Sequence, residues 1–223
     1  MAQTELEDAL RVKWNLNVAK NVIVFIGDGM DPNTVTATRI YKSGESSKLS
    51  FERFPHMGLL KTYSANKMVP DSGSTATALF CGVKVNHETV GVDTTVRKGD
   101  CVATLNRNAR LDSLVVHAQD AGKSTGLVTT MRVTHATPAP LYAHSANRRW
   151  ECEANMPKSS PCKDIARQLV EDEPGKNINV QYNARNSAAP NCLRVFQCAG
   201  STLPDPSSSQ PYSSFTPLRR FHD

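Results

Sequence analysis

Asp28 is the first of several side chains whose position suits metal or phosphate binding. It lies between Gly27 and Gly29, where the backbone can turn sharply and a ligand can come close. A carboxylate at such a point is a natural metal ligand. Asp and Gly are also ordinary turn residues, so a simple turn explains the same three residues. The segment therefore indicates a candidate metal site and leaves the turn open as the alternative.

Ser72 stands just before a segment, residues 75–80, that predicts a helix ended by Gly82. Unpaired N–H groups and the positive end of a helix dipole favour phosphate there, so this serine is placed to attack phosphorus. Serine is equally a preferred N-cap. Because no histidine lies nearby in the sequence, a reactive Ser72 would need a metal ion or a distant partner to activate it.

Three further candidates lie between residues 134 and 150. The hydroxyl of Thr137 can ligate a hard cation such as magnesium, and His135 can hold a metal-bound water. Arg148 carries a planar fork of donors that can bind two phosphate oxygens. Taken singly, Thr137 is equally a helix cap, His135 a loop residue and Arg148 a solvated surface arginine.

The apolar pattern predicts the elements that must position these side chains. Residues 21–26 and 124–130 are short, continuous apolar runs typical of parallel strands covered on both faces. Helices are predicted for residues 34–41 after Asp31-Pro32, for 75–80, for 111–120, and from Thr137-Pro138 towards Arg148. This alternation predicts an α/β fold with a largely parallel sheet and helices on both faces.

Composition narrows the function classes. The net charge of +5 comes from scattered basic residues, so nucleic-acid binding is not predicted. No apolar run reaches the roughly 18 residues that a membrane span needs, and residues 1–13 do not look like a signal-peptide core. The six cysteines form no C-x-x-C pair, so one or two disulfides and a secretory compartment are favoured over a zinc finger. An incomplete N-terminus or reduced cysteines remain the alternatives.

The composition changes after Val180. The last 43 residues hold five prolines and seven serines, only one valine and no isoleucine. Such a segment buries too little apolar surface to offset the entropy lost on ordering it. We therefore predict that residues 181–223 form a divergent, disordered tail.

The motifs resemble, in order and context, the animal members of the alkaline phosphatase family. The matching segments are residues 21–30, 69–78 and 128–150, and the second contains the Asp-Ser-x-x-Thr-Ala signature at residues 71–76. The similarity extends from about Trp14 to Val180. It implies that residues 1–180 are the N-terminal part of an alkaline phosphatase catalytic domain.

The resemblance also implies an activity, which is metal-dependent hydrolysis of small phosphate monoesters through a phosphoserine at Ser72. By the same resemblance Arg148 holds the substrate phosphate, Asp28 bridges a zinc ion and a magnesium ion, and Thr137 binds magnesium with His135 beside it. The implied cofactors are two Zn²⁺ and one Mg²⁺. A homodimer, an extracellular or cell-surface location and a disulfide between Cys101 and Cys162 are implied as well.

The sequence departs from the family pattern in its metal ligands. No histidine follows an aspartate by four residues, and no Asp-His dipeptide occurs. We therefore expect the chain to be a truncated family member without activity of its own, and any membrane anchor to lie outside it. The alternative is a catalytically dead fragment that binds phosphate or a full-length family subunit.

Overall fold

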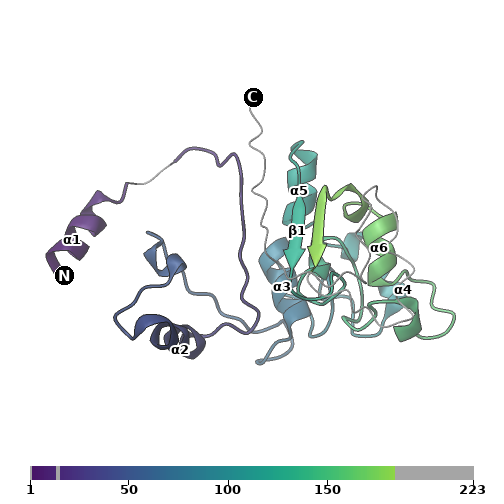
Figure 1. Ribbon diagram of the computed structural model, residues 1–223. Helices are drawn as coiled ribbons and strands as arrows, with labels where there is room; N and C mark the ends of the chain where they lie inside the picture. Colours follow the sequence, from purple (N-terminus) through teal and green to yellow (C-terminus); the bar gives the residue numbers. More distant parts are fainter. Residues whose placement is uncertain (1, 14–15, 184–223) are drawn as a thin grey trace, which may run out of the picture.

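The computed structural model describes residues 2–13 and 16–183 (Figure 1). Its α-helices are α1 (Ala2–Arg11), α2 (Pro32–Ser43), α3 (Ser72–Cys81), α4 (Cys101–Thr104), α5 (Leu114–Asp120) and α6 (Ile165–Glu171). The strands are β1 (Gly126–Thr129) and β2 (Val180–Asn183). Short 3-10 turns are η1 (Ser50–Arg53), η2 (Arg107–Ala109), η3 (Ala139–Leu141), η4 (Glu153–Asn155) and η5 (Gly175–Asn177). Within the described ranges, no helix has both the length and the apolar character needed to cross a membrane.

The strands β1 and β2 form a two-stranded parallel sheet, with Gly126 opposite Val180 and Thr129 opposite Asn183. In Figure 1, α3 and α5 lie to one side of the strand pair and α6 to the other. The predicted α/β class and parallel pairing are therefore confirmed. The sheet is much smaller than expected.

One apolar cluster joins the helices to the sheet. It contains Phe80 from α3, Val115 from α5, Leu127 from β1 and Leu169 from α6, and all four side chains are buried. Burying such side chains stabilises a fold by roughly 1.5 to 3 kcal/mol each. A second cluster is formed by Val92, Val96, Ala109, Ala146 and Trp150, with Cys101 packed against it.

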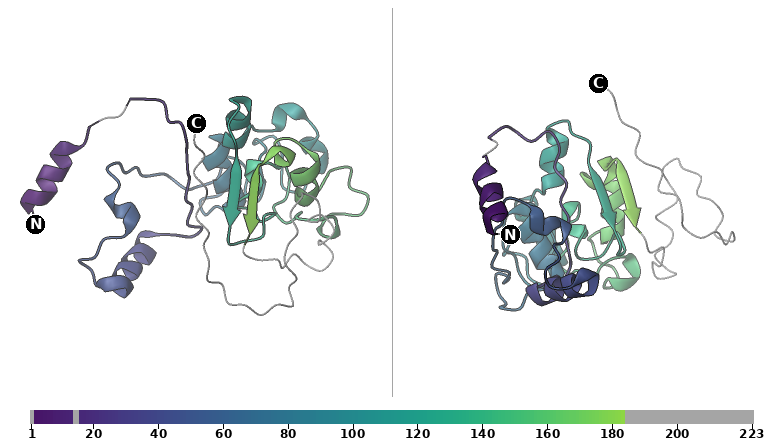
Figure 2. Two further views of the ribbon diagram at one scale, coloured as in Figure 1. Left: turned by 45° about the horizontal axis from the view of Figure 1, so that its top comes forward. Right: turned by 60° about the vertical axis from the view of Figure 1, so that its left-hand side comes forward.

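Residues 21–26 do not form the predicted buried strand. Val22, Ile23 and Phe25 are 75%, 78% and 88% exposed, and the segment carries no strand pairing. Figure 1 and the left view of Figure 2 show the N-terminal segments with α1 and α2 projecting from the rest of the fold. An apolar run becomes a strand only where a neighbour pairs with its backbone, and β1 is paired here with β2 alone.

The helices α2, α3 and α5 form close to where the sequence predicts them, because their capping residues lie next to the helix in the sequence. Asp31 caps α2, its carboxylate accepting the Thr34 N–H at 2.8 Å, and Pro32 is the first helical residue, as predicted. The helix predicted at 75–80 is α3, although Asp71 rather than Ser72 is its N-cap. The helix predicted from residue 111 begins at Leu114, where Ser113 caps it.

The helix predicted from Thr137 towards Arg148 is wrong. Only η3 forms, and Pro140 within it has no N–H to continue a helix. The chain beyond η3 pairs with a distant loop instead. Ser145 exchanges backbone hydrogen bonds of 2.8 and 2.9 Å with Val90, and the Arg148 N–H donates to the Glu88 carbonyl at 2.8 Å. These tertiary hydrogen bonds replace the helical ones.

The predicted start of the disordered tail also needs correction. Residues 181–183 belong to β2 and pair with residues 127–129 of β1. Their order comes from backbone hydrogen bonds to a neighbouring strand, which the apolar content of the segment itself does not reveal. The rest of the proposed tail lies outside the described residues.

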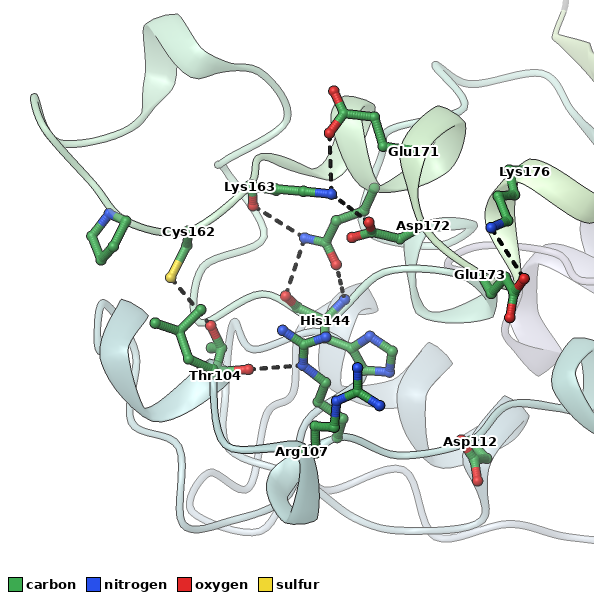
Figure 3. Close-up of a pocket in the computed structure, with 14 residues that line it drawn as sticks. Thr104, Arg107, Asp112, His144, Cys162, Lys163, Glu171, Asp172, Glu173 and Lys176 are labelled. Carbon is green, nitrogen blue, oxygen red and sulfur yellow. Dashed lines mark hydrogen bonds and ion pairs between the residues drawn. The ribbon is translucent and has the colours of Figure 1, made fainter.

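The side chain of His144 lines an open cavity of about 760 Å³ between η2 and α6 (Figure 3). Its Nε2 lies 3.2 Å from the Leu111 carbonyl oxygen, and its backbone N–H donates to Gln168 at 2.8 Å. Burial lowers the pKa of His144 to about 4, with Arg110 adding to the effect, whereas the hydrogen bond with the Leu111 carbonyl, and then Asp112 and Asp172, oppose it. This imidazole is neutral in the folded chain near neutral pH.

We expect His144 to make the fold sensitive to mild acid. Because its pKa is about 4 when folded against an ordinary 6.5, the unfolded chain binds more protons between these values. The stabilisation is complete above pH 6.5 and is lost as the pH falls through 4, by ~3 kcal/mol in all. Urea unfolding across this range should show a smaller loss for His144→Gln than for the parent. The exposed His117 gives the control, and an equal change in His117→Gln would contradict the assignment.

Candidate active site

Ser72, Asp71 and Arg148 form one hydrogen-bonded group at the start of α3. The Arg148 Nη1 donates to the Ser72 Oγ at 3.0 Å and to Asp71 Oδ2 at 3.1 Å. The two contacts span 76 and 77 residues of sequence. A guanidinium beside a serine hydroxyl is the arrangement that can hold a phosphate group against a nucleophile.

Asp71 fixes this group. Its side chain is 8% exposed, and its Oδ2 accepts the Gly73 N–H at 2.8 Å. Its Oδ1 accepts the Ser74 hydroxyl at 2.7 Å and the Glu88 N–H at 2.8 Å. Burial by itself raises the pKa of Asp71, but these hydrogen bonds outweigh it and hold the pKa below its usual value. The carboxylate is therefore charged and anchors Arg148.

The start of α3 has fewer free N–H groups than the sequence analysis expects. The N–H groups of Gly73 and Ser74 both donate to the Asp71 carboxylate. These two N–H groups are therefore already engaged, whereas Arg148 Nη1 lies 3.0 Å from Ser72 Oγ. Sequence reasoning missed Asp71, although its place directly before the helix is a strong N-cap signal.

His135 lies on the other side of Arg148. Its Nε2 is 3.4 Å from Arg148 Nη2, and its Nδ1 is 3.4 Å from the backbone nitrogen of Thr137. Burial, with the charge of Arg148 as a second cause, lowers the pKa of His135 below its usual value. A neutral imidazole is compatible with the neighbouring guanidinium.

Asp28 and Thr137 meet across the fold. The Thr137 Oγ1 donates to Asp28 Oδ2 at 3.0 Å, although 109 residues separate them. Two oxygen atoms held together in this way suit a hard cation such as magnesium. No cluster of three or more His, Cys, Asp or Glu side chains suited to a metal was found among the described residues.

All five residues singled out from the sequence therefore lie in one connected network. The contacts run from Ser72 to Arg148, then to His135, to Thr137 and to Asp28. The sequence placed these residues on three separate segments, and the fold brings the segments together.

A second, partly buried network supports the loop of His135 and had no signal in the sequence. Arg132 donates to both carboxylate oxygens of Glu151, at 2.7 and 2.8 Å, and the Thr134 hydroxyl donates to the same carboxylate at 2.7 Å. Burial opposes ionisation of Glu151, but its hydrogen bonds to Arg132 and Thr134 lower its pKa. Glu151 thus braces Arg132 and Thr134, which precede His135.

Comparison with protein families gives a match to the alkaline phosphatase family over residues 19–182. The tissue-nonspecific alkaline phosphatase of Gallus gallus is 51% identical over 183 residues, covering 78% of this chain and 35% of that protein. The Homo sapiens isozyme is 50% identical, covering 76% and 34%, and alkaline phosphatase 4 of Drosophila melanogaster is 45% identical, covering 80% and 30%. This chain spans about a third of the length of these curated relatives.

Solved structures give a consistent result. Alkaline phosphatase from the Antarctic bacterium TAB5 matches with a TM-score of 0.51 and 32% identity, covering 65% of this chain and 35% of that one. A mutant of the TAB5 enzyme with Mg bound in the M3 site matches with a TM-score of 0.50 and 30% identity, covering 65% and 34%.

Proposed function

This chain belongs to the alkaline phosphatase family, and from that premise we propose that it supplies the nucleophile and the phosphate-binding arginine of a phosphomonoesterase site. The observation that carries the proposal is the Arg148 Nη1, which donates to both Ser72 Oγ and the Asp71 carboxylate. Small phosphate monoesters are the proposed substrates. Their phosphate group matches the fork of the guanidinium.

In the proposed reaction the Ser72 Oγ attacks phosphorus as the bond to the ester oxygen breaks. The proton of the Ser72 hydroxyl passes in net terms to the departing alkoxide, which leaves as the alcohol, and a phosphoserine remains. Water then attacks the phosphorus of the phosphoserine, the bond to Ser72 Oγ breaks, and inorganic phosphate and the free Ser72 hydroxyl result. Arg148 stabilises the charge on the phosphoryl oxygens during both displacements.

The proposed magnesium ligands are Asp28 and Thr137, because both offer oxygen atoms and already lie within hydrogen-bonding distance. His135 is proposed to lie beside that ion. In this family's chemistry, bound magnesium and zinc polarise oxygen atoms and lower the pKa of water. A catalytic zinc takes about three protein ligands, and the described residues provide no such group.

The location and partners follow as further parts of the proposal. We propose residues 1–180 as part of a catalytic domain that functions in an oxidising, extracellular or cell-surface setting, because Cys101 and Cys162 are joined. A homodimer is proposed from the family alone. A nucleic-acid partner is not proposed.

A second candidate function is phosphate or subunit binding without turnover. The observation that favours it is the exposed apolar run at residues 21–26, in which Val22, Ile23 and Phe25 are largely open to solvent. Apolar surface of this kind commonly contacts another chain. This candidate predicts phosphate binding and no ester hydrolysis, even when the rest of a family protein is supplied.

The phosphate site can be tested directly with the 223-residue chain. We expect Arg148→Ala to weaken binding of inorganic phosphate by ~10- to 100-fold, because charge-assisted hydrogen bonds are lost. Arg149→Ala is the matched control, since the neighbouring side chain is 79% exposed. Titration followed by ³¹P NMR gives both affinities. Equal affinities for the parent and Arg148→Ala would refute the site.

A further inference from the structure

The main chain of Glu88 joins the two groups that bracket Ser72. Its N–H donates to Asp71 Oδ1 at 2.8 Å, and its carbonyl accepts the Arg148 N–H at 2.8 Å. The Arg148 side chain then returns to Asp71 Oδ2 at 3.1 Å. Asp71, Glu88 and Arg148 thus form a closed ring of hydrogen bonds, in which Glu88 contributes only backbone atoms.

Both Glu88 contacts depend on an unusual backbone conformation. Glu88 has a φ of 64°, in the left-handed region that residues other than glycine seldom occupy. A residue stays in this region only where its surroundings hold it there. Here the neighbouring backbone is held by the paired hydrogen bonds between Val90 and Ser145.

The side chain of Glu88 points to different partners. It forms ion pairs with Lys98 and with Arg149, the latter at 4.0 Å. Among the described residues, neither Lys98 nor Arg149 is hydrogen-bonded to Ser72. The side chain and the main chain of Glu88 can therefore be separated by mutation.

The space around the ring is also limited. A Cβ added to Gly73 would come within 2.9 Å of Asp71 Oδ2 and 3.2 Å of the Thr89 carbonyl oxygen. Thr89 itself is fully buried and hydrogen-bonded to Asn86. Asp71 consequently has little room to follow a displaced Glu88.

We propose that Glu88 is a positioning residue whose left-handed main chain sets the orientation of the Arg148 guanidinium. The proposal rests on the proposed function for the part that concerns phosphate. An arginine held in place before phosphate arrives loses less side-chain freedom on binding, so the ring raises affinity without touching the ligand.

A series of substitutions at Glu88 tests the proposal in the full 223-residue chain. Glu88→Gly accepts the left-handed conformation freely, and Glu88→Ala keeps both backbone groups but removes the ion pairs. Glu88→Val keeps the N–H but opposes a positive φ, and Glu88→Pro removes the N–H and fixes φ near −65°. Ser159→Pro is the matched control, because Ser159 is exposed and also has a positive φ of 63°.

The first readout is ¹⁵N relaxation of the Arg148 side-chain Nε–H, which does not depend on phosphate. We expect an ordered Arg148 in the parent and in the Gly, Ala and Ser159→Pro variants, and a mobile one in the Val and Pro variants. If Glu88→Pro does not fold, Glu88→Val carries the test. The proposal is overturned if the Arg148 side chain stays ordered in both the Val and the Pro variant. It is also overturned if the Gly and Ala variants lose that order to the same extent.

The second readout is the affinity for inorganic phosphate. We expect the Gly and Ala variants to bind within about twofold of the parent and the Val and Pro variants to bind ~10-fold more weakly, in line with loss of a charged hydrogen bond. If Arg148 mobility follows the series while the parent binds no phosphate, the proposed function fails and the positioning role stands. If phosphate binds equally in all variants, the positioning role fails and the phosphate site stands.

Discussion

Replacing Ser72 by alanine is expected to abolish ester hydrolysis in a chimera that joins residues 1–183 to the remaining part of the Gallus gallus isozyme. The unmodified chimera should hydrolyse a chromogenic phosphate ester when zinc and magnesium are supplied. Loss of the nucleophile removes the bond-forming atom, so the rate should fall by a factor on the order of 10⁵. The 223-residue chain by itself should show no turnover, since the described residues lack a three-ligand metal group.

Two controls make this experiment decisive. Ser43→Ala, at the end of α2, replaces an exposed serine outside the network and should leave the rate unchanged. Transfer of ³²P from substrate to the chimera should be seen with Ser72 and not with alanine at this position. A Ser72→Ala chimera that retains activity would show that another group attacks phosphorus. An inactive unmodified chimera would undermine the assignment of Ser72.

Removing the Cys101–Cys162 disulfide is expected to give the largest loss of stability from a change outside the network. The structure contains this bond, the pairing that the family resemblance implies, between cysteines 61 residues apart. A cross-link closing a loop of that length restricts the unfolded chain by ~4 kcal/mol. Domains of ordinary stability unfold with only about 5 to 15 kcal/mol, so such a loss is large.

Urea unfolding of Cys101→Ser, Cys162→Ser and the double variant provides the measurement. Either single substitution removes the cross-link, so the double variant should lose about as much as each single one rather than their sum. Cys101 also packs on the cluster of Val92, Val96 and Trp150, which should make its single variant slightly less stable than Cys162→Ser. Strictly additive losses would show that the two cysteines stabilise the fold independently.

Helix caps and prolines in the sequence predict correctly where a helix begins, because they act on adjacent residues. Asp31 and Pro32 define the start of α2 because a cap and a proline act on adjacent residues. The helix beyond Thr137 was wrong because Ser145 and Arg148 bond to Val90 and Glu88, more than 50 residues away in sequence. Hydrogen bonds at that separation leave no periodic pattern.

The candidate site likewise contains some residues that the sequence reveals and others that only the structure reveals. Residue type and family resemblance predict Ser72, Arg148, Asp28, Thr137 and His135 as site residues, and hydrogen-bonding contacts connect them in the fold. Asp71 was missed because its role depends on Glu88 and Arg148, which are 17 and 77 residues distant. Glu88 could not be found at all from the sequence, since only its φ angle and its backbone partners distinguish it.

The contact between Asp28 and Thr137 has a consequence for biosynthesis. Because 109 residues separate the two side chains, Asp28 emerges from the ribosome well before its partner exists. At roughly 5 to 20 residues per second, translation needs about 5 to 20 s to cover that interval. The apolar residues 21–26 are exposed throughout this time, as they also are in the folded chain. The contact between Asp28 and Thr137 can therefore form only after α3 and α5 have been synthesised, and before α6 and β2 exist.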